Sequence, residues 1–414
     1  MVSWEYPPLV YGGLGRHVHG LAEALVADGH EVAVVTQSHA GAPDDAVVGG
    51  VRVRRVRPDP PARSARDDLA LWTLALNAAQ VRAGQGLLRD WRADLVHAHD
   101  WLAAHAGVAL ARAAAAPLVA TIHATEAGLW NGWLVTPVSR ARHDVEAWLV
   151  RQAARTIVCS TTMRAEVSTA LGVSEDDLAE VHNAVHVQPW RSSTTERVAI
   201  RERLAVPQDS PLLVLAGRIE WEKGGHVAVD ALPRIRRRHA EAHLVLAGAG
   251  SQVAALREQA RRRRVARATR FAGRLADADL AALLGTADVA LVPSTYEPFG
   301  MIALEAAAAG TPVVAADAGG LREVVTDGVT GLLVPPHDAA ALAGAVIRLL
   351  DDPSRAAALA DAARRMVEAR YGWPLAARAT EKVYAEAVSD PRPPRPRLPP
   401  VRPGNVFTGE PVGP

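Results

Sequence analysis

The sequence has a single cysteine, no long apolar run and almost no net charge. Cys159 alone among 414 residues excludes an internal disulfide framework and is typical of a reducing compartment. The formal net charge of +1 gives no electrostatic reason to expect a nucleic-acid partner. The most apolar region, around 106–122, is interrupted by Arg112, and no signal sequence is evident. These absences predict a cytoplasmic protein.

Lysine is scarce as well. Only Lys223 and Lys382 are lysines among 46 basic residues, and the others are arginine. This skew, together with abundant alanine, indicates a GC-rich coding sequence rather than a function. A retained lysine is nevertheless a candidate functional residue, because a compact ammonium meets a phosphate differently from a guanidinium. Chance retention explains Lys382, on a predicted surface helix, whereas Lys223 lies in a glycine-rich loop.

Short β-branched runs alternate with helix-length segments through most of the chain. This alternation is typical of parallel sheets covered by helices on both faces. The chain is longer than a usual single domain, and 49% of its residues are hydrophobic, which is enough for two cores. We therefore predict an α/β fold of two doubly wound parallel-sheet domains that face a cleft. The expected strands are 31–36, 51–56, 94–99, 117–123, 156–160, 211–217, 243–248, 269–273, 289–294, 312–317 and 330–335.

Changes in composition suggest the domain boundaries. The first domain is expected over 1–185 and the second over 211–370, joined by a hinge at 186–210 that contains prolines and serine/threonine clusters. A helical pattern follows over 371–388. Residues 389–414 hold nine prolines, which predicts a disordered tail that packs in no core.

The loop GRIEWEKGG (217–225) follows the first predicted strand of the second domain. Ligands of doubly wound sheets bind at the carboxyl ends of the strands, where this loop lies. It combines Arg218, Lys223 and a Gly-Gly helix start, and so places two cations beside free backbone N–H groups, which suits a diphosphate. An ordinary charged surface loop is the alternative. The scarcity of lysine favours the functional interpretation.

The segment STYEPFGMIALEAAAAG (294–310) is the strongest motif. Glu297 precedes a predicted helix, and Glu305 lies two turns into it. The helix N-terminus near Gly300 offers unpaired N–H groups and a positive dipole end to an anion. A carboxylate at this place suits sugar hydroxyls rather than phosphate. A helix with an acidic first turn is the alternative, but Pro-Phe-Gly is unusual for a simple cap.

In the first domain, HAHDW (97–101) and TIHATEAG (121–128) both lie where strands end. A single histidine is more often a core residue than a catalyst, but two such clusters at one sheet favour a site. The N-terminal stretch WEYPPLVYGGLGRHV contains Gly12, Gly13 and Gly15, whose missing Cβ atoms would allow a ligand to approach the backbone closely. It does not match G-x-G-x-x-G, so NAD binding is disfavoured.

Several motifs in this order carry a family resemblance. SWEYPP with GGLGRHV, HAHDW, TIHATE, GRIEWEKG and EPFGMIALEAAAAGTPVVA resemble the retaining glycosyltransferases of family 4 and the related glycogen synthases. SWEYPPLVYGGLGRHVHGLAEAL and TIHATEAG are similar to actinobacterial α-1,4-glucosyltransferases of glycogen or methylglucose polysaccharide synthesis. The resemblance covers residues 1 to about 388. It implies a GT-B fold of two Rossmann-like domains, whose last helix, here 371–388, crosses back to the N-terminal domain.

The resemblance also implies a reaction and the residues of the second domain that serve it. A nucleotide-diphosphate sugar, UDP-glucose or ADP-glucose, would give its glucose to an α-1,4-glucan acceptor. Arg218 and Lys223 would hold the diphosphate, and Glu297 would contact the sugar. Glu305 would bind the ribose hydroxyls. The backbone N–H groups of two further residues would contact the phosphates, namely Gly300 and Met301.

The implied residues of the first domain lie in its loops. Gly12 and Gly13 would approach the donor diphosphate and the acceptor, and Asp100 and His123 would face the transferred sugar. The implied catalytic residues are His123, Arg218, Lys223 and Glu297. Asn183 completes the substrate-binding set in VHNAVHVQPW, where the sequence departs from the family, because Ala184 replaces a glycine and His186 an aspartate.

Other interpretations remain open beside this one. A mannosyl- or glucosyltransferase that acts on a lipid or small acceptor would use the arginine runs 234–239 and 261–267 for weak peripheral membrane contact, although solvated helix faces are the favoured reading. A dehydrogenase or epimerase would need a dinucleotide fingerprint and Tyr-x-x-x-Lys, which are missing. Asp277 and Asp279 could bind a metal but fit a helix cap better. We expect no essential metal and no cofactor.

Overall fold

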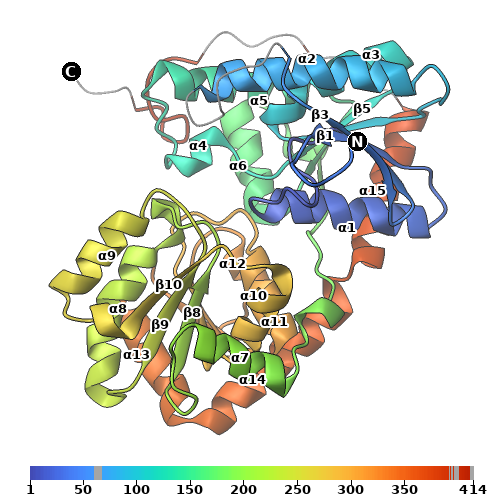
Figure 1. Ribbon diagram of the computed structural model, residues 1–414. Helices are drawn as coiled ribbons and strands as arrows, with labels where there is room; N and C mark the ends of the chain where they lie inside the picture. The colour runs from blue at the N-terminus through green and yellow to red at the C-terminus, as the bar shows by residue number, and fades with distance from the viewer. Residues whose placement is uncertain (60–67, 391, 393–394, 396–400, 411–414) are drawn as a thin grey trace. The chain divides into compact units, whose positions relative to one another are not determined.

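The computed structural model describes residues 1–59, 68–390, 392, 395 and 401–410. The chain folds into two compact units, each with its own parallel sheet (Figure 1). Unit 1 comprises Met1–Asn183 and Trp373–Pro414, and unit 2 comprises Ala184–Gly372. The chain therefore enters unit 2 after Asn183 and returns to unit 1 at Trp373.

The sheet of unit 1 is assembled in two parts around the N-terminal residues. The strands are β1 (Ala33–Gln37), β2 (Asp45–Val48), β3 (Val51–Val56), β4 (Val96–His99), β5 (Leu118–Ile122), β6 (Arg155–Val158) and β7 (Leu178–Glu180). One part has the order β1-β3-β2 and the other β4-β5-β6-β7. Among these strands of the described residues, β2 and β3 pair antiparallel and the other pairs are parallel. Val2 makes parallel bridges to Val35 of β1 and Ala98 of β4, so the first residues act as the central strand that joins both parts.

Helices cover the sheet of unit 1. They are α1 (Gly13–Ala27), α2 (Leu69–Leu87), α3 (Ala104–Ala114), α4 (Glu126–Leu129), α5 (Pro137–Gln152), α6 (Thr161–Leu171) and α15 (Trp373–Ser389). The last helix, α15, packs into this core, where Val383 and Ala387 are buried with Val119 of β5 and Ile157 of β6. At its start, Trp373 lies against Gly20 of α1.

Unit 2 is built on one parallel sheet. Its strands are β8 (Leu212–Ala216), β9 (His243–Ala247), β10 (Thr269–Gly273), β11 (Val289–Val292), β12 (Val313–Ala316) and β13 (Leu332–Val334), in the order β10-β9-β8-β11-β12-β13. Its helices are α7 (Thr194–Arg203), α8 (Gly225–Arg238), α9 (Val253–Arg262), α10 (Asp277–Gly285), α11 (Met301–Ala309), α12 (Leu321–Val324), α13 (Ala339–Asp351) and α14 (Pro353–Arg370).

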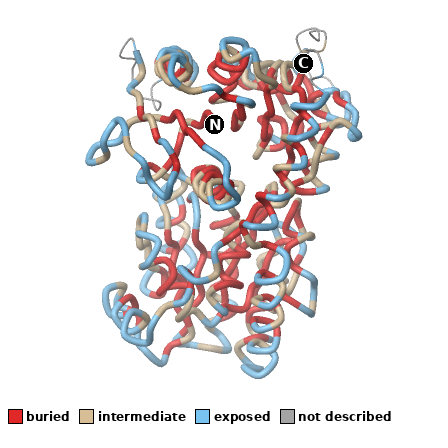
Figure 2. The backbone as a smooth tube through the Cα atoms, turned by 90° about the vertical axis from the view of Figure 1, so that its right-hand side faces the viewer, coloured by how far each residue is buried: buried red, intermediate tan, exposed pale blue. Residues whose placement is uncertain are grey.

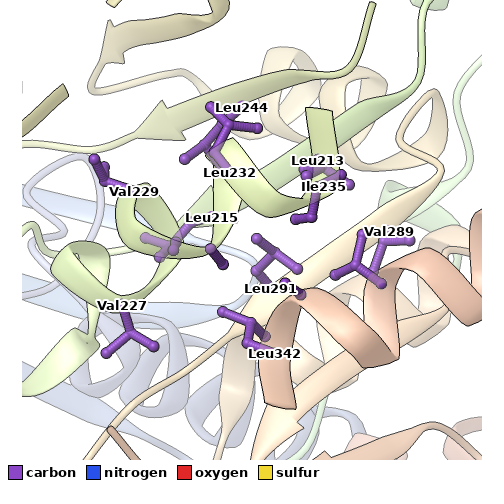
Figure 3. Close-up of a cluster of buried hydrophobic side chains, with 14 of the residues drawn as sticks. Leu213, Leu215, Val227, Val229, Leu232, Ile235, Leu244, Val289, Leu291 and Leu342 are labelled. Carbon is purple, nitrogen blue, oxygen red and sulfur yellow. The ribbon is translucent and has the colours of Figure 1, made fainter. Parts of the chain in front are cut away.

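The core of unit 2 explains its strand sequences. The leucines and valines of β8, β9 and β11 are buried between the sheet and the apolar sides of α8 and α13 (Figure 3). Strands covered on both faces read as continuous apolar runs, and Leu212–Ala216 is buried at every position. The same distribution is visible along the backbone, where strands are mostly buried and the outer helix faces are exposed (Figure 2).

Two predicted segments differ from expectation. The stretch 186–210 is not an irregular hinge, because it contains α7, which packs on α10 and starts with a capping box between Ser193 and Glu196. The tail is not disordered throughout. Residues 401–410 pack on unit 1: Trp133 forms a bridge with Asn405, and Leu134 N–H donates to the Gly404 carbonyl at 2.9 Å. Backbone hydrogen bonds and the buried Asn405 hold residues 401–410 on unit 1. The proline content of the tail gives no indication of these contacts. The remaining tail positions, 391, 393–394, 396–400 and 411–414, lie outside the described residues.

Candidate functional site

The sheet of unit 2 has a topological switch point between β8 and β11. These strands are neighbours, although β9 and β10 come between them in the sequence. The loop after β8 carries Lys223, and the loop after β11 carries Glu297. Lys223 Nζ donates a hydrogen bond to Glu297 Oε2 at 2.8 Å, and Ser294 Oγ donates to the same oxygen at 3.2 Å. The structure therefore joins two predicted site residues where such sheets bind ligands.

Backbone contacts hold the two loops together. The N–H group of Thr295 donates to the carbonyl oxygen of Glu222 at 2.7 Å. Gly224 has a φ of +69°, and a Cβ there would lie 1.9 Å from the carbonyl oxygen of Pro293. A side chain at this position would separate the loops, so glycine is needed to keep the lysine next to the glutamate.

Helix α11 begins directly beside Glu297. Gly300 is its N-cap residue with a φ of +115°, and Met301 is its first residue, so the unpaired N–H groups of the first turn have no side-chain cap at that position. Glu305 lies in the second turn and is buried. The N–H group of Gly320 donates to the carbonyl oxygen of Glu297 at 2.8 Å and fixes its backbone. An anion-binding helix end thus adjoins a carboxylate.

Arg218 stands apart from the lysine–glutamate pair. Its side chain is about half exposed, and its Nη2 lies 3.0 Å from Glu222 Oε1 in an ion pair. The arginine nevertheless leaves the same strand, β8, as Lys223. Both cations are therefore at the carboxyl end of β8, but only Lys223 contacts Glu297.

In unit 1, Asp100 and His123 follow the neighbouring strands β4 and β5. Asp100 Oδ1 accepts a hydrogen bond from the backbone N–H of His123 at 2.7 Å. Asp100 has a φ of +60°, which is uncommon for a residue with a side chain and is often found at functional sites. Burial raises the pKa of Asp100 to about 7, and hydrogen bonds from the N–H groups of His123 and Ala124 oppose this rise. The carboxyl thus titrates near neutral pH.

His123 belongs to a cluster that sequence reasoning missed. His99 Nδ1 and His123 Nε2 are 3.2 Å apart, and the ring centroids of His17 and His123 are 4.7 Å apart. Burial lowers the pKa of His17 to about 4 and the pKa values of His99 and His123 well below their ordinary range, so all three rings are neutral at pH 7. The only signal for His17 was its place one turn after Gly13. His99 belongs to the HAHDW motif, in which sequence alone does not distinguish it from His97.

His97, two residues before His99, is a structural core histidine. Its Nδ1 lies 2.7 Å from the Tyr384 hydroxyl oxygen, and its Nε2 lies 2.7 Å from Thr121 Oγ1. Both ring nitrogens are therefore satisfied inside unit 1. This residue ties β4 to α15 and has no nitrogen left for a ligand.

The glycine-rich loop before α1 is organised by Glu5, which sequence reasoning also missed. The buried Glu5 carboxylate accepts hydrogen bonds from the N–H groups of Tyr11 at 2.5 Å and Gly12 at 3.3 Å. The prediction that Gly15 admits a ligand is wrong, because a Cβ there would lie 2.9 Å from Glu5 Oε2. At Gly12 no described atom lies within 4 Å of the Cβ position, and Gly13 is exposed. These two glycines border open space.

Asn183 is the last residue of unit 1 and is buried beside His17. Its side chain is a hydrogen-bond partner of His17, which opposes the lowering of the His17 pKa by burial. Ala184, which replaces the glycine of the family pattern, does not adopt a positive φ, so alanine fits there without backbone strain.

Two other predicted features have structural roles. Helix α10 begins at Asp277 with Ala276 as its N-cap, so neither aspartate is the N-cap residue; both lie in the first turn, and Asp279 pairs with Arg203 at 2.9 Å. The arginine runs at 234–239 and 261–267 are partly engaged within unit 2. Their ion pairs and backbone contacts are Arg236 with Ala242, Arg238 with Asp351 and Arg263 with Asp230.

Comparison with known proteins decides the family. The model of Glycosyltransferase Family 4 matches residues 11–188, and that of Glycosyl transferases group 1 matches residues 196–366. The glycogen synthase of Mycobacterium tuberculosis (strain H37Rv) is 46% identical over 96% of this chain and 97% of its own. The chain belongs to glycosyltransferase family 4. The D-inositol 3-phosphate glycosyltransferase of Xylanimonas cellulosilytica is another relative of this family 4 enzyme, 38% identical over 91% of this chain and 92% of its own.

The solved structures agree with this assignment. A sucrose-phosphate synthase from Thermosynechococcus elongatus superimposes on the family 4 enzyme with a TM-score of 0.79 and 26% identity, covering 94% of this chain and 98% of that one. The enzyme has the GT-B fold, with two Rossmann-like parallel-sheet domains. None of the helices formed by the described residues is long and apolar enough to cross a membrane.

Proposed function

We propose that this family 4 enzyme transfers glucose from UDP-glucose or ADP-glucose to an α-1,4-glucan and retains the anomeric configuration. The observation that carries the proposal is the Lys223–Glu297 pair beside the N-terminus of α11, at the switch point of unit 2. The 46% identity to a glycogen synthase over nearly the whole chain supports glucose as the sugar and a glucan as the acceptor.

The departing nucleotide diphosphate gains negative charge as the bond to the sugar breaks. Arg218 and Lys223 would neutralise that charge together with the backbone N–H groups of Gly300 and Met301, which need no reorganisation because the fold already fixes them. Removal of one such preorganised group typically reduces the rate by about 10² to 10³. The negative charge of Glu297 holds the lysine in place until a phosphate shares its ammonium.

The family resemblance assigns the proposed sugar contacts to residues of each unit. Glu297 would bind hydroxyls of the transferred glucose, and Glu305 would bind the ribose hydroxyls. Asp100 and His123 would face the glucose from unit 1, where the neutral His123 ring can exchange hydrogen bonds with a hydroxyl. Three further residues would complete the substrate site, namely Gly12, Gly13 and Asn183.

A lipid or small-molecule acceptor is the second candidate. It is supported by the D-inositol 3-phosphate glycosyltransferases at 34–38% identity, whose names state a small acceptor. The arginine runs support weak peripheral membrane contact less well, because Arg236, Arg238 and Arg263 bind partners within unit 2. Flotation with anionic liposomes and a search for lipid-linked product would detect this activity.

The direct test is transfer from radiolabelled UDP-glucose and ADP-glucose to a short malto-oligosaccharide without added divalent metal. We expect a product that an α-1,4-specific amylase digests. Lys223→Ala should reduce the rate by about 10² to 10³. Lys382→Ala is the matched control, because it removes the other lysine from an exposed position on α15 and should leave the rate unchanged. Lack of transfer from both donors, or a product that resists the amylase, would refute the proposed reaction.

A further inference from the structure

Three histidines from separate elements converge in unit 1. His17 comes from α1, His99 ends β4 and His123 follows β5. One ring nitrogen from each lies within 4.8 Å of those of the other two. The ring centroids are 4.7 Å apart for His17 and His123, 5.5 Å for His99 and His123, and 5.7 Å for His17 and His99. Three imidazoles on a tetrahedral metal, with metal–nitrogen bonds of about 2.0–2.1 Å, have centroids roughly 5 Å apart.

The nitrogen atoms of the cluster outnumber its hydrogen-bond partners. His99 Nε2 is buried and has no hydrogen-bond partner among the described residues, whereas His17 has a side-chain hydrogen bond with Asn183. The 3.2 Å between His99 Nδ1 and His123 Nε2 already equals the edge of a tetrahedron of nitrogens around zinc, about 3.3 Å. Only the His17 ring has to move inward.

Nearby carboxyl groups suit a cation. The Asp100 side chain binds the backbone N–H of His123, and Glu5 is close enough to interact electrostatically with Asp100. Negative charge on these carboxyl groups would favour a cation bound nearby through electrostatic attraction. His123 is only partly buried, whereas the other two rings are buried, so the fourth metal position would open on the His123 side.

We propose that His17, His99 and His123 form a binding site for Zn²⁺ or a similar divalent transition metal, and that the bound metal inhibits sugar transfer. Imidazole nitrogen is a preferred ligand of zinc, and three histidines with an open fourth position form a common site. The metal would bind the His123 ring nitrogen and fix the ring, so that His123 could no longer hydrogen-bond to the substrate. The inhibition, though not the metal binding, rests on the proposed function.

The binding test uses the full-length protein after treatment with EDTA. Co²⁺ is added as the probe, because a tetrahedral cobalt site absorbs visible light, and Zn²⁺ is then titrated as the competitor. We expect one cobalt per chain, displaced by zinc. His17→Gln and His99→Asn should each weaken metal binding by at least about 100-fold. The loss of a group that only hydrogen-bonds to a metal ligand already weakens metal affinity by about 10- to 100-fold, and the loss of a ligand itself should weaken it more. His105→Gln, which changes an exposed histidine of α3, should bind as the wild type does.

The outcomes separate the two levels of the proposal. Equal zinc affinity in the wild type and in His17→Gln, or no tetrahedral cobalt band in large excess, would overturn the site. If both histidine variants fail to fold, the ¹⁵N chemical shifts of the wild-type histidines are measured with and without zinc. Zinc-induced shifts of all three imidazoles would support the site, and shifts of fewer than three would overturn it. Zinc at ten times its Kd should leave about a tenth of the transfer activity, which EDTA restores. Tight zinc binding with full transfer activity would refute the inhibition and the role of His123, but not the metal site.

Discussion

The Lys223–Glu297 pair makes a prediction about stability that can be separated from activity. Lys223→Met leaves the Glu297 carboxylate buried, with Ser294 Oγ as its remaining side-chain hydrogen-bond donor among the described residues. Breaking a fully buried ion pair costs about 3–5 kcal/mol. Solvent reaches 20% of the lysine side chain and 11% of the glutamate side chain, so screening reduces the expected loss to about 2 kcal/mol.

The assay is thermal unfolding of unit 2, followed beside the transfer rate. For a domain of this size about 2 kcal/mol corresponds to a lowering of Tm by roughly 4–8 °C. Glu297→Gln keeps a hydrogen-bond acceptor for Ser294 but leaves the ammonium of Lys223 without its anion. The double variant buries no unpaired charge and should recover at least half of the stability that the single changes lose. All three variants should lose activity by about 10² or more.

The stability and the transfer rate of the double variant are expected to change in different ways. If the stability losses of the single variants simply add in the double variant, the ion pair does not hold these loops together. If the double variant also regains transfer activity, the two side chains act only as a structural brace. The first result would refute the structural role of the ion pair, and the second would refute the assignment of Lys223 and Glu297 to the substrate site.

Two further predictions concern unit 1. Gly20→Ala should lower the free energy of unfolding by about 1–3 kcal/mol and increase hydrogen exchange in α1 and α15, because its Cβ would lie 2.1 Å from the Trp373 indole. The control is Gly86→Ala in α2, whose Cβ would make only an ordinary contact at 3.5 Å and which should stabilise the protein by up to about 1 kcal/mol. Equal effects of the two substitutions would contradict the close packing of α1 and α15. Burial raises the pKa of Glu146 well above its usual range, so ionisation of Glu146 destabilises the fold as pH rises. The Glu146→Gln variant should therefore be more stable than the wild type at pH 8, and this advantage should disappear towards pH 4.5. Urea unfolding measures the difference, and a difference that does not change with pH would refute burial of the carboxyl group as its cause.

The strands of both sheets could be predicted because most of them are apolar on both faces. Runs such as Leu212–Ala216 need no partner to be recognised. The two short strands that were missed lack this signal. Asp45–Val48 is largely exposed at an edge of the sheet, and Leu178–Glu180 has only three residues. The helix α7 was not predicted because its polar sequence resembles a linker. Its packing on α10 shows that it belongs to unit 2.

The candidate site shows the same division between local and long-range information. Lys223 and Glu297 stand in motifs that local chemistry makes conspicuous, although their contact requires β8 and β11 to be neighbours. Glu5 and His17 have no local signal, because their importance lies in what the fold places beside them. Gly15 was misread for this reason, since the space that it leaves open is filled by the Glu5 carboxylate.

The candidate site residues at the strand ends of unit 1 and unit 2 differ in the charge that they can offer. In unit 1 burial keeps the pKa values of His17, His99 and His123 well below neutral, so these rings contribute hydrogen bonds but no positive charge at pH 7. Asp100 adds a carboxyl that titrates near neutral pH. Unit 2 offers positive charge through the cations after β8 and the N-terminus of α11, and the proposed function assigns this charge to the departing diphosphate. Loss of activity in Lys223→Ala should accordingly not be rescued by lowering the pH into the range where an ordinary histidine becomes charged.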